Sequence, residues 1–331
     1  MNLLKNKKVN LAVGIIFSAF FLYLAVKQVN FREFFISIKN VNIWIYLSSL
    51  FATFLAYYFR ALRWKILLRP IGEFKISELF GSLMIGFMAN NIFPARAGEF
   101  LRAYSLGKKL NISSVSSFGT IVLERILDGI ILGGSLIYSI LFYPFPEILK
   151  RVTYLVLVGY ILLLVIFFMF QRNPIRTSRL ILNIFFFVPE KVKVKIRNIL
   201  DSFIEGFKIL NSTKDLIIVF IYSILVWLSS ALIIYVVLLA GGFVESYNLT
   251  FVSSIVVLAI CAVGTLLPAA PGYIGTSQYF TILSLEIFAV TQTDSLAFSV
   301  LHFISQWLPV NILGFYYFYT HHIKLESIKD E

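Results

Sequence analysis

Ionisable and amide side chains interrupt the apolar sequence between Gly86 and Asp128. Ionisable groups inside a bilayer are costly unless they are paired or hydrated, so they indicate a functional site by default. The residues that we expect to contact a polar substrate are Asn90, Asn91, Arg96, Glu99, Arg102, Glu124, Arg125 and Asp128. Three of these are cations and three are anions, so mutual pairing that only holds helices together is the alternative interpretation.

The spacing of these residues predicts two charged helix faces. The first comprises Arg96, Glu99 and Arg102, which step by three and so share one side of a helix that begins after a proline. The second falls within about 100° on the next helix and comprises Glu124, Arg125 and Asp128. The free N–H groups at a helix start suit a phosphate, and a guanidinium binds phosphate through two parallel bonds. We therefore predict that Arg96 contacts a substrate phosphate, while Glu99 and Arg102 pair with each other.

The composition of the chain is that of a membrane protein. Of its 331 residues 59% are hydrophobic and only 14% are charged, which is far from the composition of a soluble domain. We assign the net charge of +12 to basic loops that face anionic lipid headgroups rather than to nucleic-acid binding. The single cysteine, Cys261, excludes an internal disulfide. Because zinc, nucleophile-elbow, phosphate-loop and dinucleotide motifs are missing, we expect no metal, no cofactor and no ordinary enzyme chemistry.

Long apolar runs predict an all-α polytopic membrane protein. Six runs approach the length of a full span: Asn10–Val26, Val41–Phe59, Phe118–Tyr143, Val152–Phe170, Leu216–Ala240 and Leu296–Tyr319. Two further runs, Leu79–Leu106 and Phe251–Val290, are interrupted by proline and glycine. Each is either a re-entrant hairpin or a pair of spans, because irregular backbone at membrane depth needs protein or water around it. The expected hinge residues are Pro94, Gly98, Pro268, Pro271, Gly272 and Gly275.

The distribution of lysine and arginine predicts the orientation. Basic residues concentrate at the N-terminus, after the second span, in the C-terminal tail and in residues 171–214, which we expect to form an amphipathic helix in the cytoplasmic interface. Between Lys214 and Lys324 there is no lysine or arginine. The positive-inside rule then places both termini in the cytoplasm, with the protein in the cell (inner or plasma) membrane. As hairpins, the first broken run would enter from the cytoplasm and the second from outside. Two full spans in each run would leave its ends on the same sides of the membrane, so the charges alone do not distinguish the two arrangements.

The two broken runs resemble each other. The pattern P-A-x-x-G occurs at 94–98 and again at 268–272, about half a chain apart. We interpret residues 1–331 as one membrane domain whose first half, 41–143, and second half, 215–319, are inverted. Paired interruptions at matching positions of inverted halves point to the binding site of a transporter. Simple kinks in two packed helices are the alternative.

Four motifs resemble the membrane domain of the lysylphosphatidylglycerol synthase family. They are N-N-x-x-P-A-R-A-G-E-x-x-R at 90–102, E-R-x-x-D at 124–128, P-G-x-x-G at 271–275 and R-x-x-R-W at 60–64. The resemblance covers nearly the whole chain. It implies the flippase-like membrane half of multiple peptide resistance factor in stand-alone form, without the soluble aminoacyl-transferase half, and hence lipid translocation between leaflets.

The second half departs from the family pattern. Its candidate substrate-binding residues carry no fixed charge and are Tyr273, Gln278, His302 and Gln306. The family often has a glutamate where Gln278 stands and an arginine where His302 stands, so the resemblance implies that two charges have been lost together. This departure argues against specificity for a lysyl-lipid, although a histidine regains its charge at low pH.

These observations predict a lipid flippase-like transporter that moves a phospholipid or an isoprenoid-phosphate lipid between leaflets. One alternative is the membrane subunit of a lipid-modifying synthase, either of the phosphatidylglycerol lysyltransferase type or a lipid-linked sugar transferase. Another is a structural partner that docks a separate soluble synthase through the basic loop. The expected partners are membrane lipids with a phosphate-bearing headgroup, and no nucleic acid.

Overall fold

The computed structural model describes residues 3–93, 97–145, 147–173, 177, 212–266 and 270–321. All regular structure in these ranges is helical. The helices are α1 (Leu3–Val26), α2 (Phe31–Lys39), α3 (Ile43–Leu67), α4 (Ile76–Ile92), α5 (Gly98–Leu110), α6 (Ser114–Phe142), α7 (Glu147–Arg172), α10 (Thr213–Ala240), α11 (Phe243–Ser246), α12 (Phe251–Gly264), the 3-10 turn η2 (Pro271–Tyr273), α13 (Thr276–Glu286) and α14 (Gln292–Thr320).

The long helices match the predicted spans. Five are long and apolar enough to cross a bilayer, namely α3, α6, Leu149–Met169 of α7, α10 and α14. A sixth candidate is Gly14–Val26 of α1 with α2, although α2 bends away from it by 87°. A bilayer core about 30 Å thick needs about 20 apolar residues in a helix. The prediction of an all-α polytopic membrane protein with about six spans is therefore confirmed.

Local signals in the sequence fix where the helices start and stop. The Asn42 side chain accepts hydrogen bonds from the N–H groups of the first turn of α3. Ser113 does the same for α6 and Thr291 for α14. Short polar side chains at this position satisfy backbone donors that the helix itself leaves unpaired. Helix α5 ends at Asn111 in the left-handed conformation, with φ of 53°, which asparagine tolerates better than most residues.

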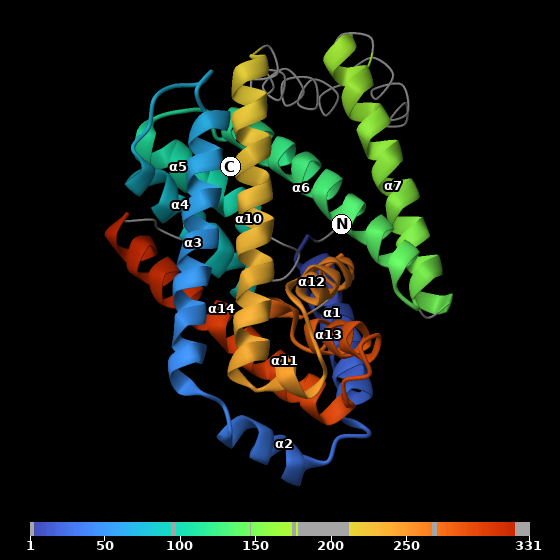
Figure 1. Ribbon diagram of the computed structural model, residues 1–331. Coiled ribbons are helices and arrows are strands. Elements are labelled where there is room, and N and C mark those ends of the chain that lie inside the picture. The colour runs from blue at the N-terminus through green and yellow to red at the C-terminus, as the bar shows by residue number, and fades with distance from the viewer. Residues whose placement is uncertain are drawn as a thin grey trace.

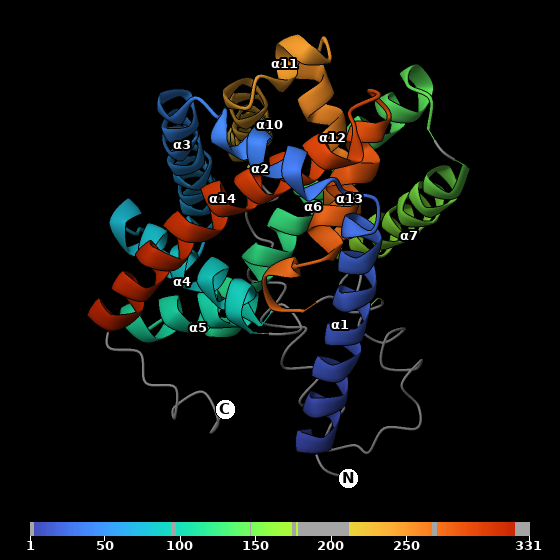
Figure 2. The ribbon, with the colours of Figure 1, turned by 90° about the horizontal axis from the view of Figure 1, so that it is seen from below.

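The spanning helices pack against one another and against both broken segments. Helices α3 and α10 lie side by side along most of their length, and α14 crosses them at an angle (Figure 1). Seen from below, α2 lies against α14 (Figure 2). One apolar core joins α3, α5 and α6 around Trp64, Leu106 and Ile121. A second joins α10, α13 and α14 around Val237 and Phe298.

The first broken run folds into a helical hairpin. Helices α4 and α5 are antiparallel, with Ser82 Oγ and Ser105 Oγ 3.3 Å apart. Glycine permits this close approach, because a Cβ on Gly98 would overlap the carbonyl oxygen of Gly86, and one on Gly86 would lie 2.6 Å from the Cβ of Arg102. The 13 residues of α5 span only about 20 Å, which is shorter than a bilayer core.

The second broken run has the same form. Helices α12 and α13 pack together, with Cys261 Sγ 3.3 Å from Thr281 Oγ1. The break between them contains η2, in which Gly272 has φ of 72°, followed by Gly275 with φ of 91°. Glycine adopts these angles without the clash that a Cβ would cause. That the hairpins are re-entrant, and that residues 41–143 and 215–319 are inverted halves, stays a prediction.

Candidate functional site

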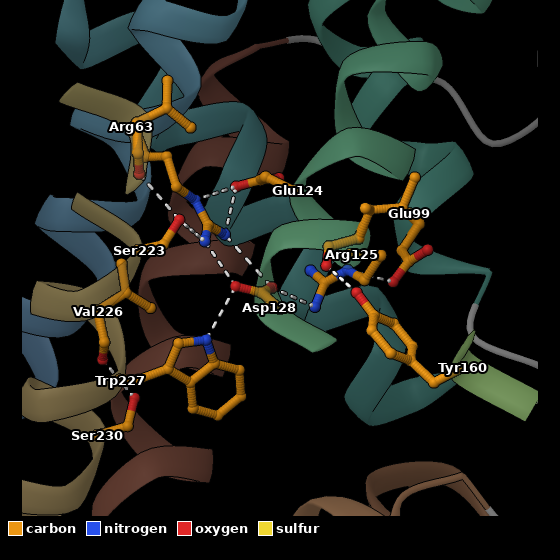
Figure 3. Close-up of polar contacts among 12 residues, drawn as sticks. Arg63, Glu99, Glu124, Arg125, Asp128, Tyr160, Ser223, Val226, Trp227 and Ser230 are labelled. Carbon is orange, nitrogen blue, oxygen red and sulfur yellow. Dashed lines mark hydrogen bonds and ion pairs between the residues drawn. The ribbon is translucent and has the colours of Figure 1, made fainter. Parts of the chain in front are cut away.

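Two carboxylates on α6 face a single arginine on α3 (Figure 3). The Nη2 of Arg63 lies 2.9 Å from Glu124 Oε1, and its Nη1 lies 2.5 Å from Asp128 Oδ1. The side chain of Arg63 is 0% exposed. The predicted span ended at Phe59, and Arg63 was assigned to a cytoplasmic segment. The helix in fact continues to Leu67, so the predicted end of the span is too early, and the buried Arg63 is balanced by the two carboxylates. Its placement on the cytoplasmic side stays a prediction.

Helix α5 completes the ion pairs. Arg102 Nη1 lies 2.6 Å from Glu124 Oε2, and its guanidinium lies 3.7 Å from the ring centroid of Trp64. Arg125 lies 3.2 Å from Glu99 on one side and 3.2 Å from Asp128 on the other. We call these six residues the ionic cluster: Arg63, Glu99, Arg102, Glu124, Arg125 and Asp128.

The expected pairing of Glu99 with Arg102 is wrong. Arg102 is 3% exposed and pairs with the buried Glu124, whereas Glu99 is 24% exposed and pairs with Arg125, which is 39% exposed. The two α5 side chains thus reach different partners on α6. The physical reason is depth, because a fully buried carboxylate needs its own cation more than an accessible one does.

Helix α10 adds neutral hydrogen bonds to the ionic cluster. Trp227 Nε1 donates to Asp128 Oδ1 at 3.0 Å, and Arg63 Nη1 donates to Ser223 Oγ at 3.0 Å. Helices α3, α5, α6 and α10 are therefore tied together at one point. Each oxygen of Glu124 and Asp128 lies near at least one arginine. Both carboxylates are therefore fully ion-paired within the described residues.

Arg60 lies one turn before Arg63 on α3 and differs from it in every contact. Its guanidinium carbon lies 5.3, 5.6 and 5.9 Å from the ring centroids of Tyr57, Phe87 and Trp227. Within the described part of the chain it forms neither an ion pair nor a hydrogen bond. Counting Arg60, four arginines face three carboxylates in this region, and Arg60 is the one that no described carboxylate contacts directly, although Asp128 attracts it from a longer distance.

The second feature of the site is a contact between the α4–α5 hairpin and the break that separates α12 from α13. The Asn90 side chain accepts a hydrogen bond from Gly98 N at 2.9 Å and thereby caps α5. Its neighbour Asn91 presents its carbonyl oxygen to the second break, because a Cβ on Gly272 would lie 3.3 Å from it. The same Cβ would lie 3.4 Å from Trp307 Nε1.

Helix α1 closes this junction. Ser18 Oγ accepts a hydrogen bond from Ala270 N, at the start of the second break, at 2.7 Å. The indole Nε1 of Trp307 is buried and has no hydrogen-bond partner among the described residues. A buried donor without an acceptor is destabilising, so it marks a place where a ligand or a different conformation would supply one. We call Ser18, Asn90, Asn91, Gly272 and Trp307 the break junction.

The remaining predicted site residues have different surroundings. Gln278 accepts hydrogen bonds from Gly275 N at 2.6 Å and Ser277 Oγ at 3.0 Å, so it caps α13. His302 Nε2 lies 2.7 Å from Gln306 Nε2, and the histidine ring stacks on Phe298. Gln278 and His302 therefore bond to different partners.

The other second-half candidates lie in the break itself or outside the described residues. Tyr273 ends η2 with φ of 58°, next to the predicted hinges Pro271, Gly272 and Gly275. Three other predicted site or hinge residues lie outside the described residues, namely Arg96, Pro94 and Pro268, as do most of residues 171–214 and both chain ends. The predictions about them stay predictions.

Sequence reasoning missed several residues of this region. Trp227, Ser223, Trp307 and Ser18 were not singled out, because each belongs to an apolar run in which nothing marks it as polar-facing. A signal did exist for Arg60 and Arg63: two arginines one turn apart at the end of a span, within a recognised motif.

Fold and site together define a polytopic helical membrane protein with a buried ionic cluster and two broken helical hairpins. The chain belongs to the family of the lysylphosphatidylglycerol synthase TM region, whose model matches residues 11–314. This confirms the resemblance found in the sequence. The family and the relatives below support a membrane lipid-related role.

Archaeal membrane proteins are among the relatives. A UPF0104 membrane protein of Methanothermobacter thermautotrophicus is 25% identical over 273 residues, which are 76% of this chain and 78% of that protein. Another, from Methanocaldococcus jannaschii, is 25% identical over 236 residues, 70% of this chain and 92% of that protein. Glycosyltransferase AglD of Haloferax volcanii is 36% identical over 76 residues, but these are 23% of this chain and only 12% of that protein.

Proposed function

We propose that this protein is a flippase-like transporter that moves a phospholipid or an isoprenoid-phosphate lipid between the leaflets of a membrane. The observation that carries the proposal is the break junction. Two interrupted helical hairpins from distant parts of the chain touch at their breaks, through the Asn91 carbonyl and Gly272. Broken helices that meet in the core of a membrane protein are the usual sites of substrate binding in transporters.

In this proposal the ionic cluster and the break junction have different roles. The ionic cluster holds α3, α5, α6 and α10 in one arrangement. The breaks contain the irregular backbone and the unpaired indole of Trp307, so they are where a headgroup would pass and where the chain would move. Acyl chains would stay in the surrounding lipid, beside the exposed apolar side chains of the outer helix faces.

The orientation is part of the same proposal. Both termini and residues 171–214 would lie on the cytoplasmic side of the cell membrane, since the basic residues of the sequence gather there. The candidate contacts on the substrate are Arg96 and the polar residues around the breaks. A soluble synthase that supplies the lipid is the partner that we propose, because the chain matches the TM region of a synthase family.

A leaflet-resolved transport assay tests the function. The purified protein would be placed in proteoliposomes with one labelled lipid at a time: phosphatidylglycerol, phosphatidylethanolamine, phosphatidylcholine or a polyprenyl phosphate. We expect at least one phosphate-bearing lipid to exchange between leaflets faster than in vesicles that contain heat-inactivated protein. Equal rates for all four lipids with active and inactivated protein would contradict the proposal.

A second candidate function is a membrane subunit of a lipid-modifying synthase. The local similarity to glycosyltransferase AglD favours it. Deleting the gene separates the two, with lipids analysed by mass spectrometry and by leaflet. A transporter changes the distribution of a lipid between leaflets and leaves its total amount nearly unchanged. A synthase subunit lowers the total amount of the modified lipid.

A further inference from the structure

We infer that Arg60 binds one lipid phosphate, at the place where α3, α4 and α10 bring Tyr57, Phe87 and Trp227 around its guanidinium. The inference deepens the proposed function and rests on it for the class of ligand. Arg60 is partly buried at about 10 Å from the Leu67 end of α3, given seven residues at 1.5 Å each. A cation at this depth is costly unless something pairs with it.

No carboxylate of the ionic cluster is free to pair with Arg60. Glu124 receives Arg63 on one oxygen and Arg102 on the other. Asp128 receives Arg63 and Trp227 on Oδ1, and Arg125 on Oδ2. Any move of Asp128 toward Arg60 would weaken its ion pair with the fully buried Arg63. An anion in direct contact with Arg60 would therefore come from outside the described residues.

The aromatic neighbours leave the donors of Arg60 available. Tyr57, Phe87 and Trp227 place their rings near the guanidinium at distances typical of cation–π contacts. None of these contacts is a hydrogen bond to an N–H donor, and the donors lie in the plane of the guanidinium. An oxyanion that approaches in this plane accepts two parallel hydrogen bonds, a geometry that phosphate fits well.

The position of Phe87 links Arg60 to the break junction. Phe87 precedes Asn90 and Asn91 by three and four residues on α4, so these side chains lie on one side of that helix. A lipid whose phosphate sits at Arg60 would have its headgroup directed along α4 toward the breaks. The site is thus placed where a headgroup would be held before it passes between the hairpins.

Binding measured without transport tests the inference. The full-length protein in detergent micelles would be titrated with dioctanoyl phosphatidylglycerol, with dioctanoylglycerol as the lipid that lacks phosphate, and with inorganic phosphate. Intrinsic tryptophan fluorescence reports binding, because Trp227 borders the site, and the midpoint of thermal unfolding gives a second readout. The variants are Arg60→Gln, Arg60→Lys and, as a matched control, Lys65→Gln. Lys65 carries the same charge on the same helix and forms no ion pair with a described residue.

We expect saturable binding of dioctanoyl phosphatidylglycerol by the wild type, and weaker binding of dioctanoylglycerol and of inorganic phosphate. Arg60→Gln should weaken the binding of phosphatidylglycerol roughly tenfold or more, the scale of a lost charge-assisted hydrogen bond. Arg60→Lys, which keeps the charge but loses the planar fork, should weaken it less, and Lys65→Gln should stay within about twofold of the wild type. Arg60→Gln removes no ion pair but loses the three cation–π contacts, so its melting temperature without lipid should fall only slightly and the protein should stay folded.

Unchanged phosphatidylglycerol binding by Arg60→Gln, or an equal loss in Lys65→Gln, overturns the inference. Inorganic phosphate that binds as tightly as the lipid, and depends on Arg60, overturns its assignment to a lipid. A protein that binds phosphatidylglycerol through Arg60 but transports no lipid would refute the proposed function and leave this site in place. If Arg60→Gln fails to fold, Arg60→Lys alone decides, since identical affinity to the wild type would contradict bidentate binding.

Discussion

The ionic cluster and the break junction both place polar groups among apolar helices, yet they treat them differently. In the ionic cluster the carboxylates of Glu124 and Asp128 are surrounded by arginines from three helices and by the indole of Trp227. At the break junction the indole of Trp307 is buried without an acceptor, and Gly272 has a positive φ. The comparison indicates that the carboxylates of the first region are held in one arrangement, although Nε and Nη2 of Arg102 are themselves buried without a hydrogen-bond partner. In the second region the unpaired donor lies beside irregular backbone, where we propose that a group from outside is accepted.

Breaking the central ion pair tests the structural side of this comparison and should have the largest effect. Arg63→Ala leaves Glu124 and Asp128 buried with fewer counterions, which we expect to lower the free energy of unfolding by about 3–5 kcal/mol. The measurement is the melting temperature and the folded yield in detergent. The matched control is Arg69→Ala, whose exposed pair with Asp215 should contribute no more than about 1 kcal/mol. Equal stability of the two variants would show that the cluster is no anchor.

The glycine contact of the first hairpin gives the next largest effect. Gly98→Ala places a Cβ against the carbonyl oxygen of Gly86, so α4 and α5 must separate at a cost of about 1–3 kcal/mol. Gly134→Ala on α6 is the control, because a Cβ at Gly134 would have no atom within 4 Å and alanine favours the helical conformation. A melting temperature of Gly98→Ala equal to that of Gly134→Ala would mean that the two helices are not closely packed in the membrane.

A pair of identical substitutions compares the two regions directly. Trp227→Phe removes a donor that bonds to Asp128 and should cost about 1–3 kcal/mol of stability. Trp307→Phe removes a donor that has no partner in the described structure, so stability should stay the same or rise. If the Trp307 donor contacts substrate, its loss should slow lipid transport while the melting temperature holds. The opposite order of stabilities would reverse our assignment of the two regions.

The smallest expected effect is a pH dependence at the end of α14. Burial, with a contribution from the neighbouring Lys109, lowers the pKa of His321 from 6.5 to about 4, and Glu78 opposes the shift. Between pH 6.5 and about pH 4, His321 is therefore protonated more readily in the unfolded chain than in the folded one. The free energy of unfolding consequently falls as pH drops through this range. Melting temperatures between about pH 7.5 and about pH 5 should decline less steeply in His321→Gln than in the wild type. Parallel slopes would show that His321 does not contribute.

The sequence predicted the helices well and their contacts poorly. Apolar runs and capping residues such as Asn42 and Thr291 are local signals, so spans and broken hairpins could be located. The end of α3 could not, because Arg63 is kept in a buried helix by Glu124 and Asp128, which lie more than 60 residues away. The local pairing predicted for Glu99 and Arg102 failed for the same reason, since each found a partner on α6.

The site was predicted in part. Asn90, Asn91 and Gly272 were singled out, and they lie at the break junction. The side-chain oxygen of Gln278 accepts a hydrogen bond from Gly275 N, and its role in substrate binding stays a prediction. Trp307 gave no signal, because an unpaired indole is recognised only once its surroundings are known. The role of Arg96 as a phosphate contact stays a prediction.

The account depends most on passage of a headgroup through the break junction, and one transport measurement tests it directly. The initial rate of labelled phosphatidylglycerol exchange between leaflets would be compared in proteoliposomes for the wild type, Gly272→Ala and Gly134→Ala. A Cβ at Gly272 strains a backbone with φ of 72° and approaches the Asn91 carbonyl, whereas one at Gly134 meets nothing. We expect Gly272→Ala to lose most of the exchange rate and Gly134→Ala to keep it. Wild-type exchange by a folded Gly272→Ala protein would contradict passage through the junction.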